Sequence, residues 1–156
     1  MESAYIYKTP AGKIMIVVRE DTVTRLYFEK QIQAQGILVK ETSLHKEAIK
    51  QLEEYFTKKR KTFDLPLDIK GTEFQKKVWN ALLKIPYGQT KSYKEIAKTV
   101  GNEKASRAVG MANNRNKLPI LIPCHRVIGT DGKLVGFGSG LEIKKILLDL
   151  EKNNLR

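Results

Sequence analysis

The stretch Pro119-Ile-Leu-Ile-Pro-Cys-His-Arg-Val127 contains the only cysteine of this 156-residue chain. Three apolar residues between two prolines predict a short buried strand, and Pro123, which has no N–H to donate, predicts that the strand ends at the thiol. Cys124 is therefore expected at a strand end, where it is held rigidly and a substrate can reach it. His125 and Arg126 offer the base and the cation that make a thiol nucleophilic by lowering its pKa. The alternative is that Cys124 is a small buried apolar residue beside a core histidine.

Helix signals on both sides of this stretch predict that the second half of the chain is mainly helical. Capping boxes, in which Ser or Thr is followed three residues later by Glu or Gln, occur at Thr72 with Gln75, Ser92 with Glu95, and Ser139 with Glu142. The helix after Ser92 is expected to stop near Gly101, and the next is expected to cover residues 102–114. Two short helices joined in this way form a helix-turn-helix pattern, which either binds DNA or is an ordinary corner between helices.

The first half of the chain predicts a small β-sheet and one helix. Segments of alternating or continuous apolar character, separated by turn residues, predict strands at Ala4–Lys8, Lys13–Arg19 and Val23–Phe28. Apolar residues at helical spacing from Leu44 to Phe56 then predict a helix. The basic segment that follows, which contains Pro66, is expected to link a domain of residues 1–66 to a domain of residues 71–156.

The net charge of +12 is distributed unevenly along the chain. Residues 1–70 hold 13 Lys and Arg against 10 Asp and Glu, whereas residues 71–156 hold 16 against 7. A strongly basic second half is typical of a protein that binds nucleic acid, because neutralising phosphates releases counterions. The alternative is an ordinary lysine-rich surface exposed to water.

Composition excludes several classes of protein. A hydrophobic content of 41% is enough for a folded core. A single cysteine excludes an intramolecular disulfide and a cysteine-rich zinc site, which indicates a reducing compartment. No stretch approaches the roughly 18 apolar residues that span a bilayer, and the N-terminus has no basic region followed by an apolar run. We therefore expect a soluble, cytoplasmic protein with no membrane partner, no metal and no cofactor.

The sequence around Cys124 resembles the active-site signature of the O6-alkylguanine-DNA alkyltransferases, which move an alkyl group from guanine to their own cysteine. The similarity runs from about Thr72 to Glu151, and its further motifs are Phe74-Gln-Lys-Lys-Val-Trp79, Ile85-Pro-Tyr-Gly88, Ser92-Tyr-Lys-Glu-Ile-Ala97, Arg107-Ala-Val-Gly110, Asn116 and Gly136-Phe-Gly-Ser-Gly-Leu141. The resemblance implies an α/β (α+β) fold whose N-terminal part is a small antiparallel β-sheet with a helix, ribonuclease H-like in type. It implies a C-terminal domain that is mainly helical and winged-helix-like, and that binds DNA through a helix-turn-helix motif.

The resemblance also implies a reaction. A monomer of the protein repairs O6-methylguanine, and also O4-methylthymine, in double-stranded DNA, and each molecule is consumed because it keeps the alkyl group. Because guanine O6 lies in a stacked base pair, the nucleotide must be flipped out before a thiol can attack its alkyl group. Cys124 would be the nucleophile, His125 would accept its proton through a water, and Glu151 would orient the imidazole. Asn116 would brace the turn between the two halves of the site. Tyr93 would lie beside the rotated phosphate and donate a proton to the departing guanine.

The implied DNA contacts centre on the helix at residues 102–114, laid in the minor groove. Arg107 would be the finger that fills the space of the extruded nucleotide, and Arg126 would add a second contact. Small residues that let the helix backbone approach the DNA are Ala105, Ser106 and Gly110. The pocket for the flipped base would be built from Val127, Phe137, Gly138 and Ser139, with Phe137 in the place of a tyrosine found in some relatives.

Each implied role has a plainer alternative. Arg107 is otherwise a solvated or phosphate-binding arginine, Tyr93 a half-buried aromatic residue and Glu151 a surface glutamate, while the small residues form a helix-packing face. At the level of function, the alternatives are a protein that only binds DNA lesions and a Cys-His hydrolase that turns over repeatedly. A branch of the family that lacks the cysteine only binds damage, and the presence of Cys124 argues against that role.

Overall fold

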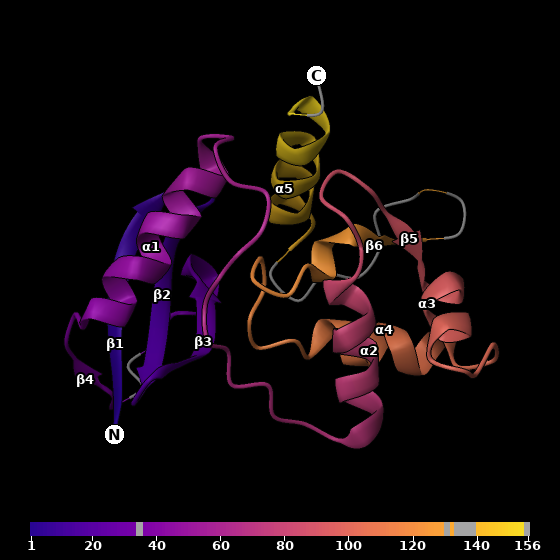
Figure 1. The fold of residues 1–156 in the computed structure, drawn as a ribbon, viewed down its shortest axis with the longest axis horizontal. Coiled ribbons are helices and arrows are strands. Elements are labelled where there is room, and N and C mark those ends of the chain that lie inside the picture. Colours follow the sequence, from indigo (N-terminus) through magenta and orange to yellow (C-terminus); the bar gives the residue numbers. More distant parts are fainter. Residues whose placement is uncertain (34–35, 130–131, 133–139, 155–156) are drawn as a thin grey trace. The chain divides into compact units, whose positions relative to one another are not determined.

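The computed structural model describes residues 1–33, 36–129, 132 and 140–154, and its chain divides into two compact units, Met1–Ile69 and Lys70–Arg156 (Figure 1). Each unit has its own helices and its own β-sheet. No helix in these described ranges is long and apolar enough to cross a membrane.

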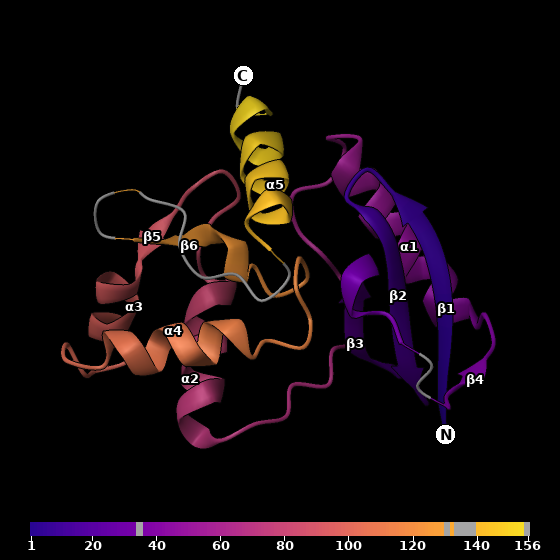
Figure 2. The same cartoon turned by 180° about the vertical axis from the view of Figure 1, so that it is seen from behind.

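The first unit is a four-stranded sheet with a helix on one face, as the views from the front and from behind show (Figures 1 and 2). The strands, in the order in which they lie in the sheet, are β3 (Thr22–Phe28), β2 (Gly12–Arg19), β1 (Glu2–Thr9) and β4 (Leu38–Val39). The three long strands pair antiparallel, and β4 runs parallel to β1. Their existence and that of helix α1 (Ser43–Phe56) confirm the prediction for this half, whereas the two-residue β4 and the short 3₁₀ helix η1 (Glu29–Gln31) were not expected.

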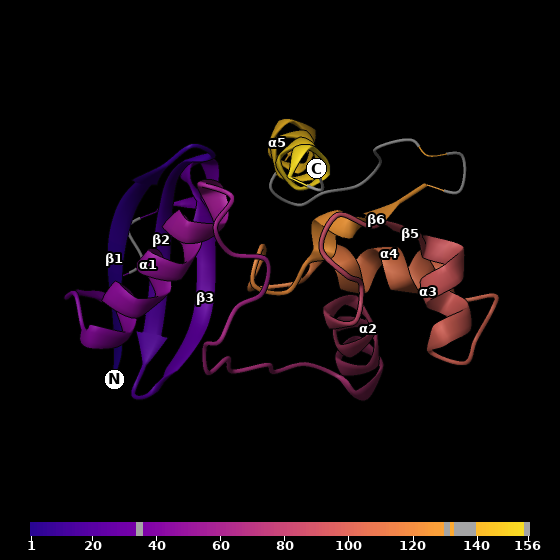
Figure 3. The same ribbon diagram turned by 45° about the horizontal axis from the view of Figure 1, so that its top comes forward.

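The core of this unit surrounds β2, whose residues Ile14–Val18 are all buried. Helix α1 crosses one face of the sheet (Figure 3) and buries Ala48, Leu52 and Tyr55 completely. The partly buried side chains of Tyr27, Ile32 and Ile37 pack against Ala4, Met15 and Val17 in a separate buried cluster. Because consecutive side chains are buried there, the segment Ile14–Val18 is a continuous apolar run.

His45 ties α1 to the sheet and is fully buried. Its Nδ1 accepts a hydrogen bond from the Thr42 backbone N–H at 3.0 Å, so its Nε2 carries the proton and donates to the carbonyl oxygens of Ser3 and Ile16, each 3.2 Å away. Burial lowers the pKa of His45 more than these backbone hydrogen bonds raise it. His45 is therefore a neutral structural ring.

The second unit is built on helices that pack on one another, with a small parallel sheet beside them (Figure 2). Its elements are α2 (Glu73–Leu83), β5 (Lys91–Ser92), α3 (Tyr93–Thr99), α4 (Ser106–Asn114), the 3₁₀ helix η2 (Cys124–Arg126), β6 (Val127–Ile128) and α5 (Leu141–Asn153). Helix α4 packs on α2, where the buried Trp79 indole N–H donates to the Ala112 carbonyl at 2.9 Å. Strands β5 and β6 pair in parallel, which brings the start of α3 next to the residues that follow Cys124.

Two of the three predicted capping boxes are confirmed. Thr72 Oγ1 accepts from the Gln75 N–H at 3.1 Å, and Ser92 Oγ accepts from the Glu95 N–H at 3.0 Å. The helix expected after the third capping box, α5, begins at Leu141 after Gly140, whose φ is 101°. Ser139, the residue expected to cap this helix, lies outside the described residues.

The start of the second helix of the helix-turn-helix is later than predicted. Helix α4 begins at Ser106 and not near Asn102. Asn102 instead closes a turn, since its side-chain Oδ1 accepts from the Lys104 N–H at 3.2 Å and its carbonyl accepts from the Ala105 N–H at 3.0 Å. An Asn side chain that bonds to nearby backbone groups competes with helix formation, which explains the delay.

The strand predicted before Cys124 is wrong as well. The Ile122 N–H donates to the Leu118 carbonyl at 2.8 Å and the Cys124 N–H to the Ile122 carbonyl at 2.7 Å, so the chain folds back in consecutive tight turns. Ile120 has a φ of 71°, a left-handed conformation that β-branched residues rarely adopt. The apolar residues of this segment are buried as a compact turn, which holds Cys124 at the first position of η2.

Candidate active site around Cys124

Cys124 is held by two asparagine side chains. Asn113, near the end of α4 and 1% exposed, donates from Nδ2 to the Cys124 carbonyl at 3.2 Å. Asn116 donates from Nδ2 to the Ile122 carbonyl at 2.9 Å and accepts the Leu118 N–H on Oδ1 at 2.9 Å. Asn116 thus lies on the turn that it was expected to brace, whereas Asn113 was not anticipated from the sequence.

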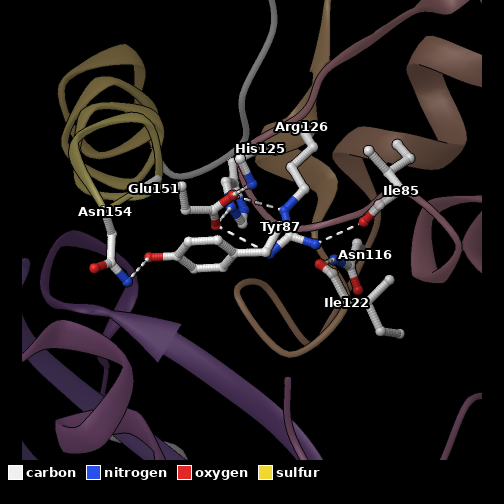
Figure 4. A network of polar contacts seen from close by, with 9 residues as sticks. Ile85, Tyr87, Asn116, Ile122, His125, Arg126, Glu151 and Asn154 are labelled. Carbon is white, nitrogen blue, oxygen red and sulfur yellow. Dashed lines mark hydrogen bonds and ion pairs between the residues drawn. The ribbon is translucent and has the colours of Figure 1, made fainter. Parts of the chain in front are cut away.

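His125, the residue after Cys124, forms a buried pair with Glu151 of α5 (Figure 4). Their Nε2 and Oε2 atoms are 2.6 Å apart, and their side chains are 0% and 1% exposed. Burial alone would raise the pKa of Glu151, but the hydrogen bonds and charges of His125 and Arg126 lower it to about 2. An ionised carboxylate only accepts hydrogen bonds, so the His125 proton lies on Nε2 and Nδ1 carries the lone pair.

The free lone pair of His125 faces the protein interior. Within residues 1–33, 36–129, 132 and 140–154, Nδ1 is buried and has no hydrogen-bond partner. Burial lowers the pKa of His125, the charges of Arg126 and Lys144 lower it further, and Glu151 opposes them. The ring is therefore a neutral base on the residue that directly follows Cys124 in the chain.

The thiol needs such a base. Cys124 is 3% exposed, and burial raises its pKa to about 11 even though the Asn116 side chain, the Lys144 charge and nearby backbone N–H groups act in the opposite direction. Protonated sulfur is a poor nucleophile. The arrangement can activate Cys124 only by moving its proton to a neighbouring acceptor.

Lys144 is the cation of the site that sequence reasoning missed. It lies on α5, is 0% exposed, and donates from Nζ to the Val127 carbonyl at 2.6 Å. Burial lowers its pKa to about 8, and Cys124 raises it in return. A signal was present, because Lys144 shares one helical face with the buried Leu147 and Glu151 at spacings of three and seven residues.

Arg126 is placed differently from the expectation. Its guanidinium donates to Glu151 at 2.8 Å and 3.1 Å and to the Ile85 carbonyl at 2.8 Å, lies 5.7 Å from the centre of the Tyr87 ring, and the residue is only 6% exposed (Figure 4). The prediction that Arg126 contacts DNA is therefore wrong, because its donors are turned into the protein. Nor is it the cation that acts on the thiol, a position that Lys144 occupies.

Tyr93 connects this site to α4. It is half-buried at the start of α3, its ring centre lies 6.0 Å from Lys144 Nζ, and a side chain added at Gly110 would meet its ring at 3.8 Å. Burial, and then the charge of Cys124, raise the pKa of Tyr93. The tyrosine therefore lies between the sulfur site and the middle of α4.

Helix α4 turns one side inward and the other toward water. Val109, Ala112 and Asn113 are buried, whereas Arg107, Ala108 and Met111 are exposed. Ala105, Ser106 and Gly110 are half-buried at the border. Of the expected base-pocket residues, Val127 is fully buried, and Phe137, Gly138 and Ser139 lie outside the described residues.

Comparison with known proteins matches both units to domains of the same protein family. The family model described as "6-O-methylguanine DNA methyltransferase, DNA binding domain" matches residues 73–153, and "6-O-methylguanine DNA methyltransferase, ribonuclease-like domain" matches residues 4–69. A methylated-DNA–protein-cysteine methyltransferase of Methanosarcina barkeri is 51% identical over 97% of this chain and 98% of its own length. The constitutive methylated-DNA–protein-cysteine methyltransferase of Bacillus subtilis is 51% identical over 93% of this chain and 92% of its own length. The crystal structure of Mycobacterium tuberculosis OGT in complex with DNA has a TM-score of 0.92 and 41% identity, covering 97% of this chain and 94% of that one.

Proposed function

The chain belongs to the 6-O-methylguanine DNA methyltransferase family, and from this premise we propose that it repairs DNA by moving an alkyl group from guanine O6 to Cys124 Sγ. The family and the mixed α/β fold predicted from the sequence are confirmed. The observation that carries the proposal is the buried His125–Glu151 pair directly after Cys124 in the chain, in which His125 Nδ1 is a buried base with no hydrogen-bond partner among the described residues.

The transfer is an in-line displacement at the alkyl carbon. The Cys124 proton moves to His125 Nδ1 through a water, the thiolate forms a bond to the alkyl carbon, and the bond from that carbon to guanine O6 breaks. Guanine leaves with the electron pair and takes up a proton, which the Tyr93 hydroxyl supplies. Because the product is a thioether that the site has no means of cleaving, each molecule accepts one alkyl group and is then spent.

Burial of the thiol requires that the base come to the protein. Cys124 is 3% exposed, so a guanine within a stacked duplex cannot bring its O6 substituent to the sulfur. The nucleotide is flipped out, at a cost of a few kcal/mol for unstacking. Arg107 supports this step because it is exposed on α4, one turn from Gly110 and the Tyr93 ring. It fills the vacated position in the stack, while Tyr93 lies against the rotated phosphate.

The flipped base is recognised mainly by backbone groups. Asn113 and Lys144 hold the carbonyls of Cys124 and Val127, which accept hydrogen bonds from the guanine edge. O4-methylthymine, which presents a similar alkyl oxygen, is a second substrate, and double-stranded alkylated DNA is the partner of a monomer.

Intact-mass spectrometry tests the proposal. After incubation with a duplex containing O6-methylguanine, the protein should gain the mass of one methyl group, located on Cys124 by peptide fragmentation, and the amount transferred should never exceed one equivalent. Retention of the methyl group on bound DNA would favour a protein that only recognises lesions. Formation of more than one equivalent of demethylated guanine in the DNA would favour a hydrolase with turnover.

A further inference from the structure

Arg126 is built into the interior as the third member of the His125–Glu151 pair. Its Nε donates to Glu151 Oε1 at 2.8 Å and its Nη2 donates to Oε2 at 3.1 Å, which is the two-point contact that a guanidinium makes with a carboxylate. Its Nη1 donates to the Ile85 carbonyl at 2.8 Å, which fixes the plane of the group (Figure 4). Its position is therefore set by three directed contacts.

The guanidinium and the imidazole share one oxygen atom. Glu151 Oε2 accepts both Arg126 Nη2 at 3.1 Å and His125 Nε2 at 2.6 Å, so a permanent positive charge lies close to the ring. Glu151 also accepts the Gly88 backbone N–H on Oε1 at 3.1 Å. The negative charge of this carboxylate is thus already balanced by Arg126 before His125 takes up a proton.

We propose that Arg126 is a positioning residue that keeps the His125 imidazole unprotonated in the resting protein, so that Nδ1 is available for the Cys124 proton. The part of this proposal that concerns proton transfer from Cys124 rests on the proposed function. The part that concerns the protonation state of His125 is independent of it.

The charges around the ring support this assignment. The charged groups that act on His125 are Glu151 and Lys144 on α5 and Arg126 on η2, and Cys124 precedes it in the chain. With Arg126 present, a proton from solvent would place a second cation against one carboxylate in a buried site that already holds Lys144, which is unfavourable. Transfer of the thiol proton is different, because it creates an anion and a cation together and leaves the net buried charge unchanged.

Without Arg126, the same reasoning gives the opposite result. Glu151 would then lose the permanent counter-charge of Arg126 and would favour an imidazolium, as carboxylate–histidine pairs do. A protonated His125 cannot accept the Cys124 proton. Arg126 therefore acts on the sulfur through His125 and Glu151, without touching a substrate.

The direct test is a histidine titration by NMR, which needs no DNA. The chain has two histidines, so His45 in the first unit serves as an internal reference. In Arg126→Met the pKa of His125 should rise by about one to three pH units relative to the native protein, with the His45 titration unchanged. Arg126→Lys, which keeps the charge, should restore most of the native value. A His125 titration in Arg126→Met equal to that of the native protein would overturn the proposal.

A double variant separates charge from packing. Arg126→Met with Glu151→Gln removes both charges, and the pKa of His125 should return toward the native value. This variant also serves if Arg126→Met alone does not fold, since it leaves no unpaired carboxylate and can be compared with Glu151→Gln alone. If the pKa of His125 in the double variant stayed as high as in Arg126→Met, the electrostatic role would be wrong. It would also be wrong if the pKa of His125 in Glu151→Gln, which keeps Arg126, were not lower than in the double variant.

The pH profile of methyl transfer connects the assignment to the reaction. In Arg126→Met the acid side of the profile should move to higher pH by the same amount as the His125 titration, with partial recovery in Arg126→Lys. A loss of rate that is uniform across pH would indicate a structural role only and would contradict the proposal. If the native protein transferred no methyl group, the proposed function would fail while the NMR result would stand by itself.

Discussion

Replacement of Glu151 by Gln should change how the second unit responds to acid. The carboxylate is 1% exposed and accepts hydrogen bonds from His125, Arg126 and the Gly88 N–H. Its pKa is lowered from 4.5 to about 2, although burial acts in the opposite direction. As pH falls, the unfolded chain therefore binds this proton first, and the folded state loses stability.

The size of the effect follows from the change in pKa. One pKa unit corresponds to about 1.4 kcal/mol, so ionisation of Glu151 stabilises the folded state by roughly 3 kcal/mol at neutral pH. The stabilisation is fully present above about pH 5 and is lost progressively toward about pH 2. Between about pH 7 and about pH 3 the carboxylate should thus account for a loss of about 2 kcal/mol.

Urea unfolding followed by tryptophan fluorescence reports on the second unit of the protein, which contains Glu151. The reason is that Trp79 is the only tryptophan of the chain and is buried in α2. With about 1–3 kcal/mol per molar urea, the native midpoint should fall by about 1 M more than that of Glu151→Gln over this pH range. Asp149→Asn, an exposed change on the same helix, is the matched control and should follow the native protein.

Glu151→Gln should also be less stable than the native protein at neutral pH, since it leaves the Arg126 guanidinium buried without its carboxylate, at a cost of about 3–5 kcal/mol. If it is too unstable to measure, the Arg126→Met, Glu151→Gln double variant takes its place. The reasoning is refuted if the midpoint of the variant without the carboxylate falls as steeply with pH as the native midpoint.

Three further substitutions address the reaction itself. Cys124→Ala should abolish methyl transfer and leave DNA affinity nearly unchanged, because the thiol supplies a bond and little binding surface; a variant that still gained a methyl group would exclude Cys124 as the acceptor. Arg107→Ala should slow repair of duplex DNA strongly but hardly affect reaction with the free base O6-benzylguanine, and Arg107→Leu should recover part of the duplex rate. Equal losses on both substrates would place the defect in the cysteine pocket. Lys144→Met should raise the pKa of the Cys124 thiol, seen as a shift of iodoacetamide alkylation to higher pH by about one unit or more, and Lys144→Arg should shift it less. An unchanged alkylation profile would show that this cation does not act on the sulfur.

Local sequence determined the regular elements of this protein. The strands of the first unit and helix α1 follow from the spacing of apolar residues, and the starts of α2 and α3 follow from capping boxes at Thr72 and Ser92. These signals depend on contacts between residues a few positions apart, so they can be read without knowledge of the fold. The motifs around Cys124 identified the family and named His125 and Glu151, which the structure places in contact.

Only the tertiary structure decided what happens where local preference and burial compete. The segment before Cys124 has the composition of a strand, yet it folds back through a left-handed Ile120, because packing around the turn outweighs the preference of a β-branched residue. Arg126 was expected to contact DNA and Lys144 was not singled out, but both are buried: Arg126 is paired with Glu151, and Lys144 lies against the Val127 carbonyl. A charge can be buried only where distant segments supply its partners. Those partners come from α5, from the loop at Ile85 and from Val127 of β6, far from each cation in the sequence, so only the fold brings them together.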